Sequence, residues 1–173
     1  MSRKPIVVDA NLMHLIFRAF ILQEGNLYTE ALAQLDVLYW IAVDDGGHAM
    51  HEYDECCRPK GATIGLRDWL AERFRLGLVR EVEMDRRPFR YLAKEYGLPE
   101  EDVKWVAIAY SSDSQYILTE DIDLFDPKKK ALSGAARLAF MKNGSGAVRK
   151  CVRKRHNIEV LCTSTFCEVC TQK

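Results

Sequence analysis

Short runs of β-branched residues alternate with longer stretches of helical periodicity along this 173-residue chain. Such alternation is typical of βαβ units, in which a helix connects two parallel strands of one sheet. The expected strands cover residues 6–8, 39–43, 79–84, 116–118 and 158–161. The pattern therefore predicts an α/β fold, a three-layer α/β/α sandwich with a roughly five-stranded parallel sheet.

The segments between the expected strands carry apolar residues at the spacing of amphipathic helices. The expected helices cover residues 11–21, 28–36, 48–57, 64–76, 89–96, a segment that opens at Pro99, 134–141 and 147–155. The chain has the length of one ordinary domain. We therefore expect a single domain over residues 1–162, followed by a frayed, cysteine-containing tail at 163–173.

The charge composition limits how the chain can attract a partner. It has 25 basic and 25 acidic side chains, so any nucleic-acid binding must depend on local patches rather than on a global positive field. Apolar stretches are interrupted by charge before the roughly 18–20 residues that a membrane span requires. The first residues lack the apolar segment of a secretory signal. The composition predicts a cytoplasmic protein without membrane contact.

Acidic residues directly follow three of the expected strands: Asp9, the pair Asp44 and Asp45, and the pair Asp121 and Asp123. The carboxyl ends of parallel strands meet at one edge of a sheet, where ligands commonly bind. A single Asp at such a place is more often a helix N-cap or a turn residue. Several carboxylates together repel one another unless a cation balances them. The sequence predicts a cation site at this edge.

Four motifs, taken in order, resemble those of the PIN-domain nuclease family. Residues 7–11 (VVDAN) look like its opening strand motif, and residues 118–125 (LTEDIDLF) are similar to its late motif of Thr, two Asp and Phe. Asp102 lies in the first turn of the helix before the fourth strand, where the family has another acid. Residues 41–47 (IAVDDGG), followed by Glu52-Tyr53, resemble the form in which Glu supplies the second acid.

The resemblance covers about residues 5–126 and implies a catalytic metal site. The implied ligands are Asp9, Glu52, Asp102 and Asp121, with Asp123 as a further candidate, and Asn11 and Thr119 would orient them. Glu52 competes for its role with Asp44, Asp45, Asp54 and Glu55, which lie close to it in sequence. Independently of the family, hard oxygen ligands suit Mg²⁺ or Mn²⁺, which activate water for attack on phosphorus.

The resemblance implies a metal-dependent endonuclease with an RNA substrate, since most members of the family cut RNA. A small nuclease of this type is often a toxin or a defence effector, so an inhibitory antitoxin-like protein is an expected partner, and homo-oligomers remain open. One alternative is a non-catalytic PIN-like scaffold that binds RNA or protein, and another is a DNA-cleaving defence nuclease. The scaffold predicts missing acids, whereas every expected acidic position is filled here.

The densest basic segment lies near the end of the chain. Its members are Arg149, Lys150, Arg153, Lys154 and Arg155, which are candidates for binding substrate phosphates. Lys128–Lys130 could act in the same way. The alternative for both segments is a solvated surface.

The cysteines offer a third function class, a zinc-stabilised binding module. Cys162, Cys167 and Cys170, with Cys151 and His156 upstream, could bind structural zinc. A second CxxC pair is missing, so reduced thiols in a frayed tail are favoured. The run 48–52 (HAMHE) lacks the metalloprotease pattern, because Glu55 stands where its second His would be.

Overall fold

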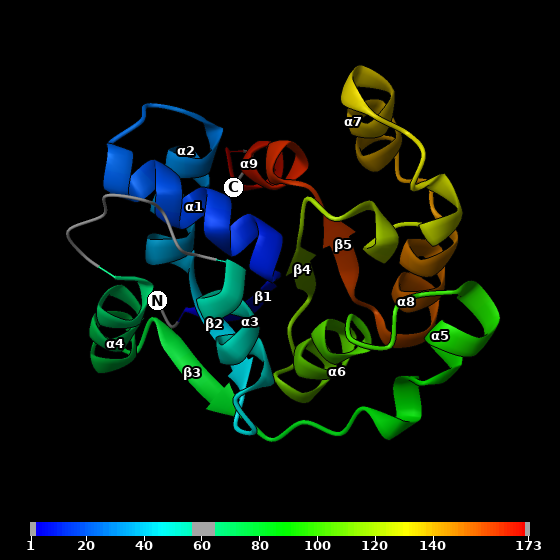
Figure 1. Ribbon diagram of the computed structural model, residues 1–173, viewed down its shortest axis with the longest axis horizontal. Coiled ribbons are helices and arrows are strands. Elements are labelled where there is room, and N and C mark those ends of the chain that lie inside the picture. The colour runs from blue at the N-terminus through cyan, green and yellow to red at the C-terminus, as the bar shows by residue number, and fades with distance from the viewer. Residues whose placement is uncertain (1–2, 57–64, 172–173) are drawn as a thin grey trace.

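The computed structural model describes residues 3–56 and 65–171, which form an α/β fold around one parallel sheet (Figure 1). The strands are β1 (Lys4–Val8), β2 (Tyr39–Asp44), β3 (Val79–Val82), β4 (Tyr116–Leu118) and β5 (Glu159–Leu161). They pair in the order β3-β2-β1-β4-β5, and every pairing is parallel. The expected five-stranded parallel sheet is confirmed.

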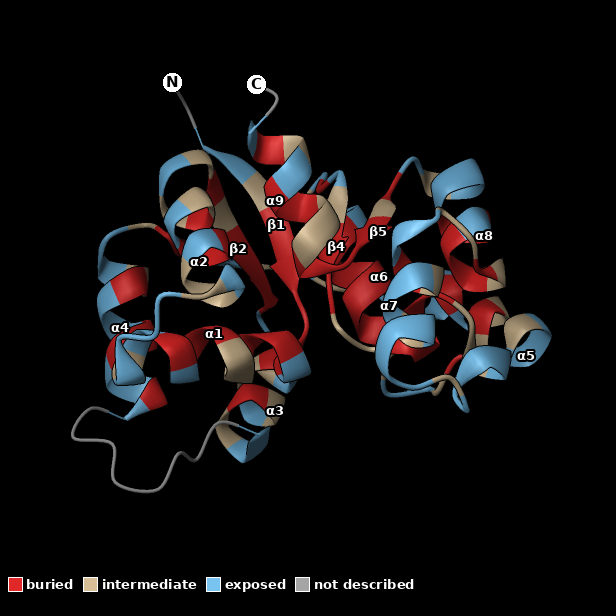
Figure 2. Ribbon diagram, turned by 90° about the horizontal axis from the view of Figure 1, so that it is seen from above, coloured by how far each residue is buried: buried red, intermediate tan, exposed pale blue. Residues whose placement is uncertain are grey.

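Two layers of helices enclose the sheet (Figures 1 and 2). One layer contains α1 (Ala10–Leu22), α2 (Leu27–Leu38), α3 (His48–Cys56), α4 (Leu66–Arg75) and α9 (Thr163–Thr171). The other contains α5 (Tyr91–Tyr96), α6 (Val103–Ser111), α7 (Gly134–Lys142) and α8 (Ala147–His156). In chain order, β2 and β3 are added on one side of β1, and β4 and β5 are then added on its other side. Because crossovers between parallel strands are right-handed, this reversal puts the two sets of connecting helices on opposite faces.

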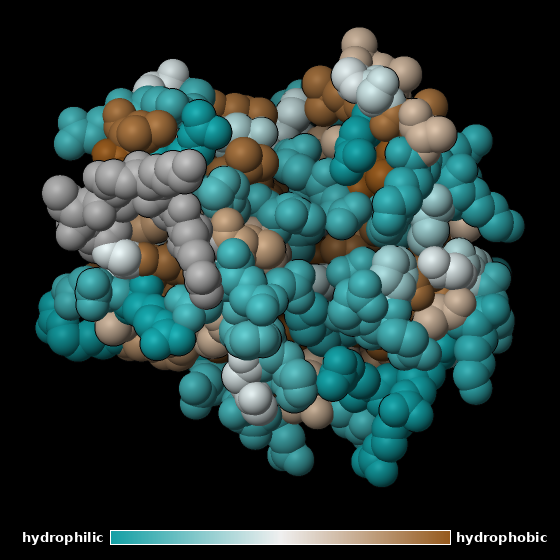
Figure 3. Space-filling view, viewed as in Figure 1, coloured by the Kyte–Doolittle hydropathy of each residue, from teal (hydrophilic) through white to brown (hydrophobic). Residues whose placement is uncertain are grey.

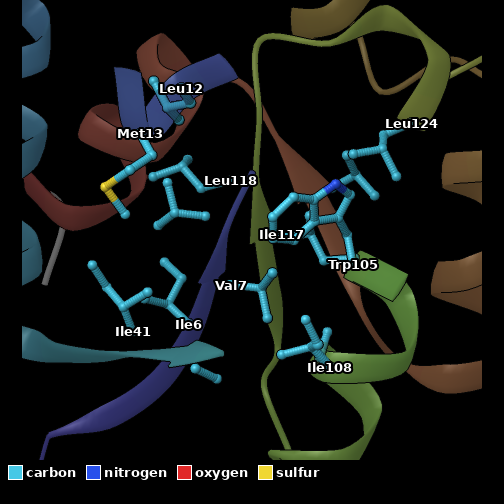
Figure 4. Close-up of a cluster of buried hydrophobic side chains, with 14 of the residues drawn as sticks. Ile6, Val7, Leu12, Met13, Ile41, Trp105, Ile108, Ile117, Leu118 and Leu124 are labelled. Carbon is cyan, nitrogen blue, oxygen red and sulfur yellow. The ribbon is translucent and has the colours of Figure 1, made fainter. Parts of the chain in front are cut away.

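Residues of the central strands alternate between the two faces of the sheet. Ile6 of β1 points towards α1, whereas Val7 points towards the layer that contains Trp105 and Ile108 of α6 (Figure 4). Each of these side chains is at most 1% exposed. Burial on both faces explains why residues 6–8 of β1 are continuously apolar instead of alternating with polar residues.

Several boundaries differ from the expectation by a few residues. β3 ends at Val82, because its ladder with β2 runs from Val79 to Val82. The helix expected from Pro99 begins at Val103, and a turn with a hydrogen bond from Asp102 N to Pro99 O (3.0 Å) precedes it. A short 3₁₀ helix, η1 (Arg87–Phe89), precedes α5. The expected ends at residues 57 and 64 lie outside the described residues.

The C-terminal segment folds as α9, so the expectation of a frayed tail is wrong. Phe166 is fully buried and Cys167 is 5% exposed, and α9 packs against α2. Glu120 Oε1 accepts hydrogen bonds from the backbone N (2.9 Å) and hydroxyl (2.5 Å) of Thr163 at the start of this helix. This partner lies 43 residues earlier in the chain, where a local sequence pattern could not reveal it.

The outer surface is mainly polar on the face shown in Figure 3. Hydrophobic residues gather at α7, where Leu138 is 44% exposed and Met141 is buried. Within the described part of the chain, no helix is both long and apolar enough to cross a membrane.

The strand order fixes where a ligand site is expected. β1 lies between β2 and β4, and the direction in which the sheet grows reverses between β1 and β4. In open parallel sheets, ligands bind outside the carboxyl ends of the strands at this topological switch point. Asp9 directly follows β1, and Thr119 directly follows β4.

Candidate metal centre

Asp9 connects the ends of the two central strands. It is 2% exposed and caps α1, with Oδ1 accepting a hydrogen bond from Leu12 N at 2.8 Å. Its Oδ2 accepts a hydrogen bond from the hydroxyl of Thr119, which is fully buried. Thr119 Oγ1 in turn accepts from Asp121 N at 2.7 Å. The carboxylate of Asp9 is therefore held in a fixed position relative to the loop after β4.

Three further carboxylates converge beside Asp9. Asp102, Asp121 and Asp123 each offer an oxygen, and these three atoms lie within 4.8 Å of one another. Asp121 Oδ1 caps a short 3₁₀ helix, η2 (Ile122–Leu124), by accepting from Asp123 N at 3.0 Å. Its Oδ2 accepts from Asn11 Nδ2 at 3.3 Å. Asn11 at the start of α1 thus contacts an acid 110 residues later, and its role in orienting a metal ligand stays a prediction.

Asp123 supplies an independent indication of a cation site. It is 3% exposed, and its Oδ2 accepts from Lys130 Nζ at 2.9 Å. Its Oδ1 is buried and has no hydrogen-bond partner. A buried carboxylate oxygen without a partner loses its hydration without compensation, and a bound cation is a usual remedy.

The electrostatics of the cluster favour a divalent cation. Burial raises the pKa of Asp9 to about 7, against the opposing hydrogen bonds from Thr119 and Leu12 and with a further increase from Asp121 and Asp102. Burial, followed by the charge of Asp121, likewise raises the pKa of Asp102 to about 7, while Lys104 opposes the shift. A divalent cation would lower the energy of the ionised carboxylates and displace their protons. The oxygen donors present therefore fit Mg²⁺ or Mn²⁺.

Glu52 lies at the edge of this cluster and already has a partner. It forms an ion pair with Lys104 of α6, whose side chain is 4% exposed. The position of α3 is fixed by Tyr53, whose hydroxyl donates to Val8 O at 2.5 Å and whose ring stacks on Trp105 at 5.9 Å. Sequence reasoning missed Lys104. The sequence feature that could have revealed it is a single basic residue inside the otherwise apolar run of α6.

The other acids after β2 have different roles. Asp44 is 1% exposed and accepts from the backbone N atoms of His48 (2.9 Å) and Ala49 (2.7 Å) and from His48 Nδ1 (2.7 Å). Burial alone would raise the pKa of Asp44, but these hydrogen bonds outweigh it and lower the pKa. Asp54 pairs with Arg67, and Asp45 is exposed. Among these competing acids, Glu52 is the one whose charge raises the pKa of Asp102.

The basic segment of α8 divides into buried and exposed members. Arg149 is 6% exposed, and its guanidinium donates to Glu159 Oε1 (2.6 Å) and Met141 O (2.9 Å). Arg149 therefore serves the packing of α8 against β5, and its side chain is not open to a substrate. Arg153 Nε lies 3.5 Å from Glu159 Oε2, and Arg155 lies over the ring of Tyr91. Lys150 and Lys154 are exposed, and their contact with phosphate stays a prediction.

The cysteines expected as an alternative zinc site are divided between the two helical layers. Cys151 and His156 belong to α8, and His156 Nε2 lies 2.8 Å from the hydroxyl of Tyr91. Cys167 and Cys170 belong to α9 in the opposite layer. Among the described residues, the cluster with metal-binding geometry is instead the one formed by three aspartates.

Comparison with protein-family models gives no match, and comparison with curated proteins gives no significant match. The functional conclusion must therefore come from the chemistry of the acidic site and its place in the sheet.

Proposed function

We propose that this protein is a Mg²⁺- or Mn²⁺-dependent endonuclease with a PIN-like site. The observation that carries the proposal is the buried, unpartnered Oδ1 of Asp123 within a cluster that also contains Asp102 and Asp121. Asp121 and Asp123 of this cluster follow β4, next to the topological switch point of a parallel sheet. Oxygen-rich, strongly anionic sites of this kind suit hard divalent cations and, through them, phosphate chemistry.

Each residue of the site has a distinct part in the proposal. Asp102, Asp121 and Asp123 would hold the cation, and Asn11 would keep Asp121 oriented. Asp9 adds buried negative charge, and its bond with Thr119 fixes the distance between the two strand ends. A bound Mg²⁺ or Mn²⁺ would supply an activated water for attack on phosphorus and would stabilise the leaving oxygen.

The substrate we propose is RNA, in line with the family whose motifs the sequence resembles. The chain has no net charge to attract a polyanion, so the local cations near the site must contribute most. Lys130 is 74% exposed and reaches the cluster directly, so its ammonium could contact a phosphate once a cation neutralises Asp123. A cytoplasmic location and an inhibitory antitoxin-like partner belong to the same proposal.

The proposal is tested by Mn²⁺-dependent cleavage of labelled single-stranded RNA by the full chain, with EDTA as the metal-free comparison. Asp9→Asn and Asp121→Asn should each abolish cleavage while the circular dichroism spectrum stays unchanged. Asp126→Asn is the matched control, because Asp126 caps the next 3₁₀ helix, η3 (Pro127–Lys129), without belonging to the cluster. Full activity of both site variants would refute the nuclease site.

Single-stranded DNA of the same sequence, assayed in parallel, distinguishes the alternative of a DNA-cleaving nuclease. A wild-type protein that binds RNA without cleaving it, and takes up no Mn²⁺ in calorimetry, would instead be the non-catalytic scaffold.

A further inference from the structure

A buried lysine lies beside the cation cluster and is fixed on several sides. Lys104 pairs with Glu52, and its Nζ also donates to Glu101 O at 2.8 Å. The same ammonium lies 4.6 Å from the centre of the Trp105 ring. Lysine is rarely buried, because removing an ammonium from water is energetically unfavourable. A residue retained at that cost inside an apolar helix needs a compensating electrostatic interaction.

The charges around Lys104 provide that interaction. Five carboxylates gather here, those of Asp9, Glu52, Asp102, Asp121 and Asp123. The negative charge of Glu52 raises the pKa of Asp102, and the positive charge of Lys104 lowers it. Lys104 thus places an ammonium group at the Glu52 side of the cluster.

Lys130, a second basic residue at the cluster, differs from Lys104 in exposure. Lys130 is 74% exposed and makes one ion pair, with Asp123, so a metal ion or a phosphate can displace it at little cost. Lys104 is 4% exposed and has three contacts, so it cannot leave without disrupting the packing between α3 and α6.

The availability of carboxylate oxygens limits how many cations the site can hold. Two-metal sites place their ions about 3.5–4 Å apart, which requires carboxylates that are free to bridge or flank both ions. Asp9 does not belong to the group of three aspartates whose oxygens lie within 4.8 Å of one another. Glu52 is paired with Lys104. The three remaining aspartates form a ligand set for one cation.

We propose that Lys104 takes the place of a second divalent cation, so that this site works with one bound metal ion and one fixed ammonium. The inference rests on the proposed function and specifies its metal requirement. Lys104 is a positioning residue in this scheme: it neutralises Glu52 and sets the charge around Asp102.

The test counts bound Mn²⁺ on the full chain by calorimetry and by electron paramagnetic resonance. Wild-type protein should bind one Mn²⁺ and show an uncoupled spectrum. Lys104→Met frees Glu52 and should bind two Mn²⁺, with the spin coupling of a close pair. The double variant Lys104→Met/Glu52→Gln removes both charges and should return to one Mn²⁺, as should Glu52→Gln alone.

Lys104→Met leaves Glu52 without its partner and could fail to fold in EDTA. In that case the melting temperature supplies the readout: added Mn²⁺ should raise it more in Lys104→Met than in wild type, and equally in the double variant and wild type. Two Mn²⁺ in wild type, or a folded Lys104→Met that binds one, would overturn the inference while leaving the nuclease proposal intact. A wild-type protein that binds no Mn²⁺ would overturn the proposed function itself.

Discussion

Asp9 and Asp44 are a matched pair whose replacement by Asn should have opposite effects on stability. Both directly follow or end a central strand, both cap a helix through backbone N–H groups, and they are 2% and 1% exposed. They differ in their surroundings. Burial is the main cause of the raised pKa of Asp9 and the nearby carboxylates add to it, whereas hydrogen bonds from Ala49 and His48 outweigh burial at Asp44 and lower its pKa. The charge of Asp9 should therefore destabilise the metal-free fold, and the charge of Asp44 should stabilise it.

The magnitude for Asp9 follows from its pKa, which rises from 3.8 to about 7 on folding. Between these values the folded protein keeps the proton and the unfolded chain has lost it, so stability falls as the pH rises through this window. A shift of about 3 units corresponds to roughly 4 kcal/mol, an upper value for a site that can relax. Asn keeps the acceptor for Leu12 N and is an equally good N-cap.

Asp9→Asn should therefore raise the melting temperature of the metal-free protein at about pH 8, and the gain should vanish near pH 4. A gain of about 2–4 kcal/mol corresponds to roughly 4–16 °C for a chain of this size. The sign is reversed for Asp44, whose lowered pKa stabilises the fold above about pH 4, a contribution lost as the pH falls through the folded pKa. Asp44→Asn keeps the cap but removes the charge that the hydrogen bonds from His48 and Ala49 stabilise, so it should cost roughly 1 kcal/mol at neutral pH.

The assay is thermal unfolding in EDTA across the pH range, followed by circular dichroism, for wild type and both variants. A lower melting temperature for Asp9→Asn at about pH 8, or a difference that does not change with pH, would show that Asp9 is only a helix cap.

Three further outcomes follow from the structure. Mn²⁺ should stabilise wild-type protein strongly at about pH 8 and weakly at about pH 5, because Asp9 and Asp102, with pKa values near 7, must lose their protons first. Equal increases in melting temperature at the two pH values would contradict this. Phe166→Ala should cost about 3–5 kcal/mol in urea unfolding, and an unchanged midpoint would show that α9 contributes little to the fold. Arg149→Gln should destabilise the protein by about 3–5 kcal/mol, whereas Lys154→Ala should keep stability and raise the KM for RNA; the reverse ranking would place Arg149, not Lys154, at the substrate.

The centre of the sheet was predictable because β1 and β4 are buried on both faces where they pair. Residues 6–8 and 116–118 had to be continuous apolar runs, and such runs are visible without knowledge of their neighbours. The strand ends then located Asp9 and Asp121, since position in a parallel sheet decides where ligands bind. Asp102 depended on the family resemblance, and the structure brings its carboxylate next to that of Asp121.

What the sequence did not reveal depends on contacts between distant segments. Glu120 caps α9 from 43 residues away, and without that contact the last segment has the composition of a tail. Arg149 belongs to a basic run, yet Glu159 binds it in the interior. Lys104 is one lysine in an apolar helix, and its role depends on Glu52 from another element. Charge composition alone cannot distinguish a basic residue that faces a substrate from one that neutralises a buried acid.

The hydrogen bond between Asp9 and Thr119 joins residues separated by 110 positions. Asp9 therefore leaves the ribosome long before Thr119, Asp121 and Asp123, and an incomplete chain holds only part of the cluster. Pairing of β4 with β1 brings the two halves together as one of the most non-local events in the sheet. Under the proposed function, a growing chain beside its own messenger RNA has no hydrolytic capacity, and the ability to cut RNA arises only when folding is nearly complete.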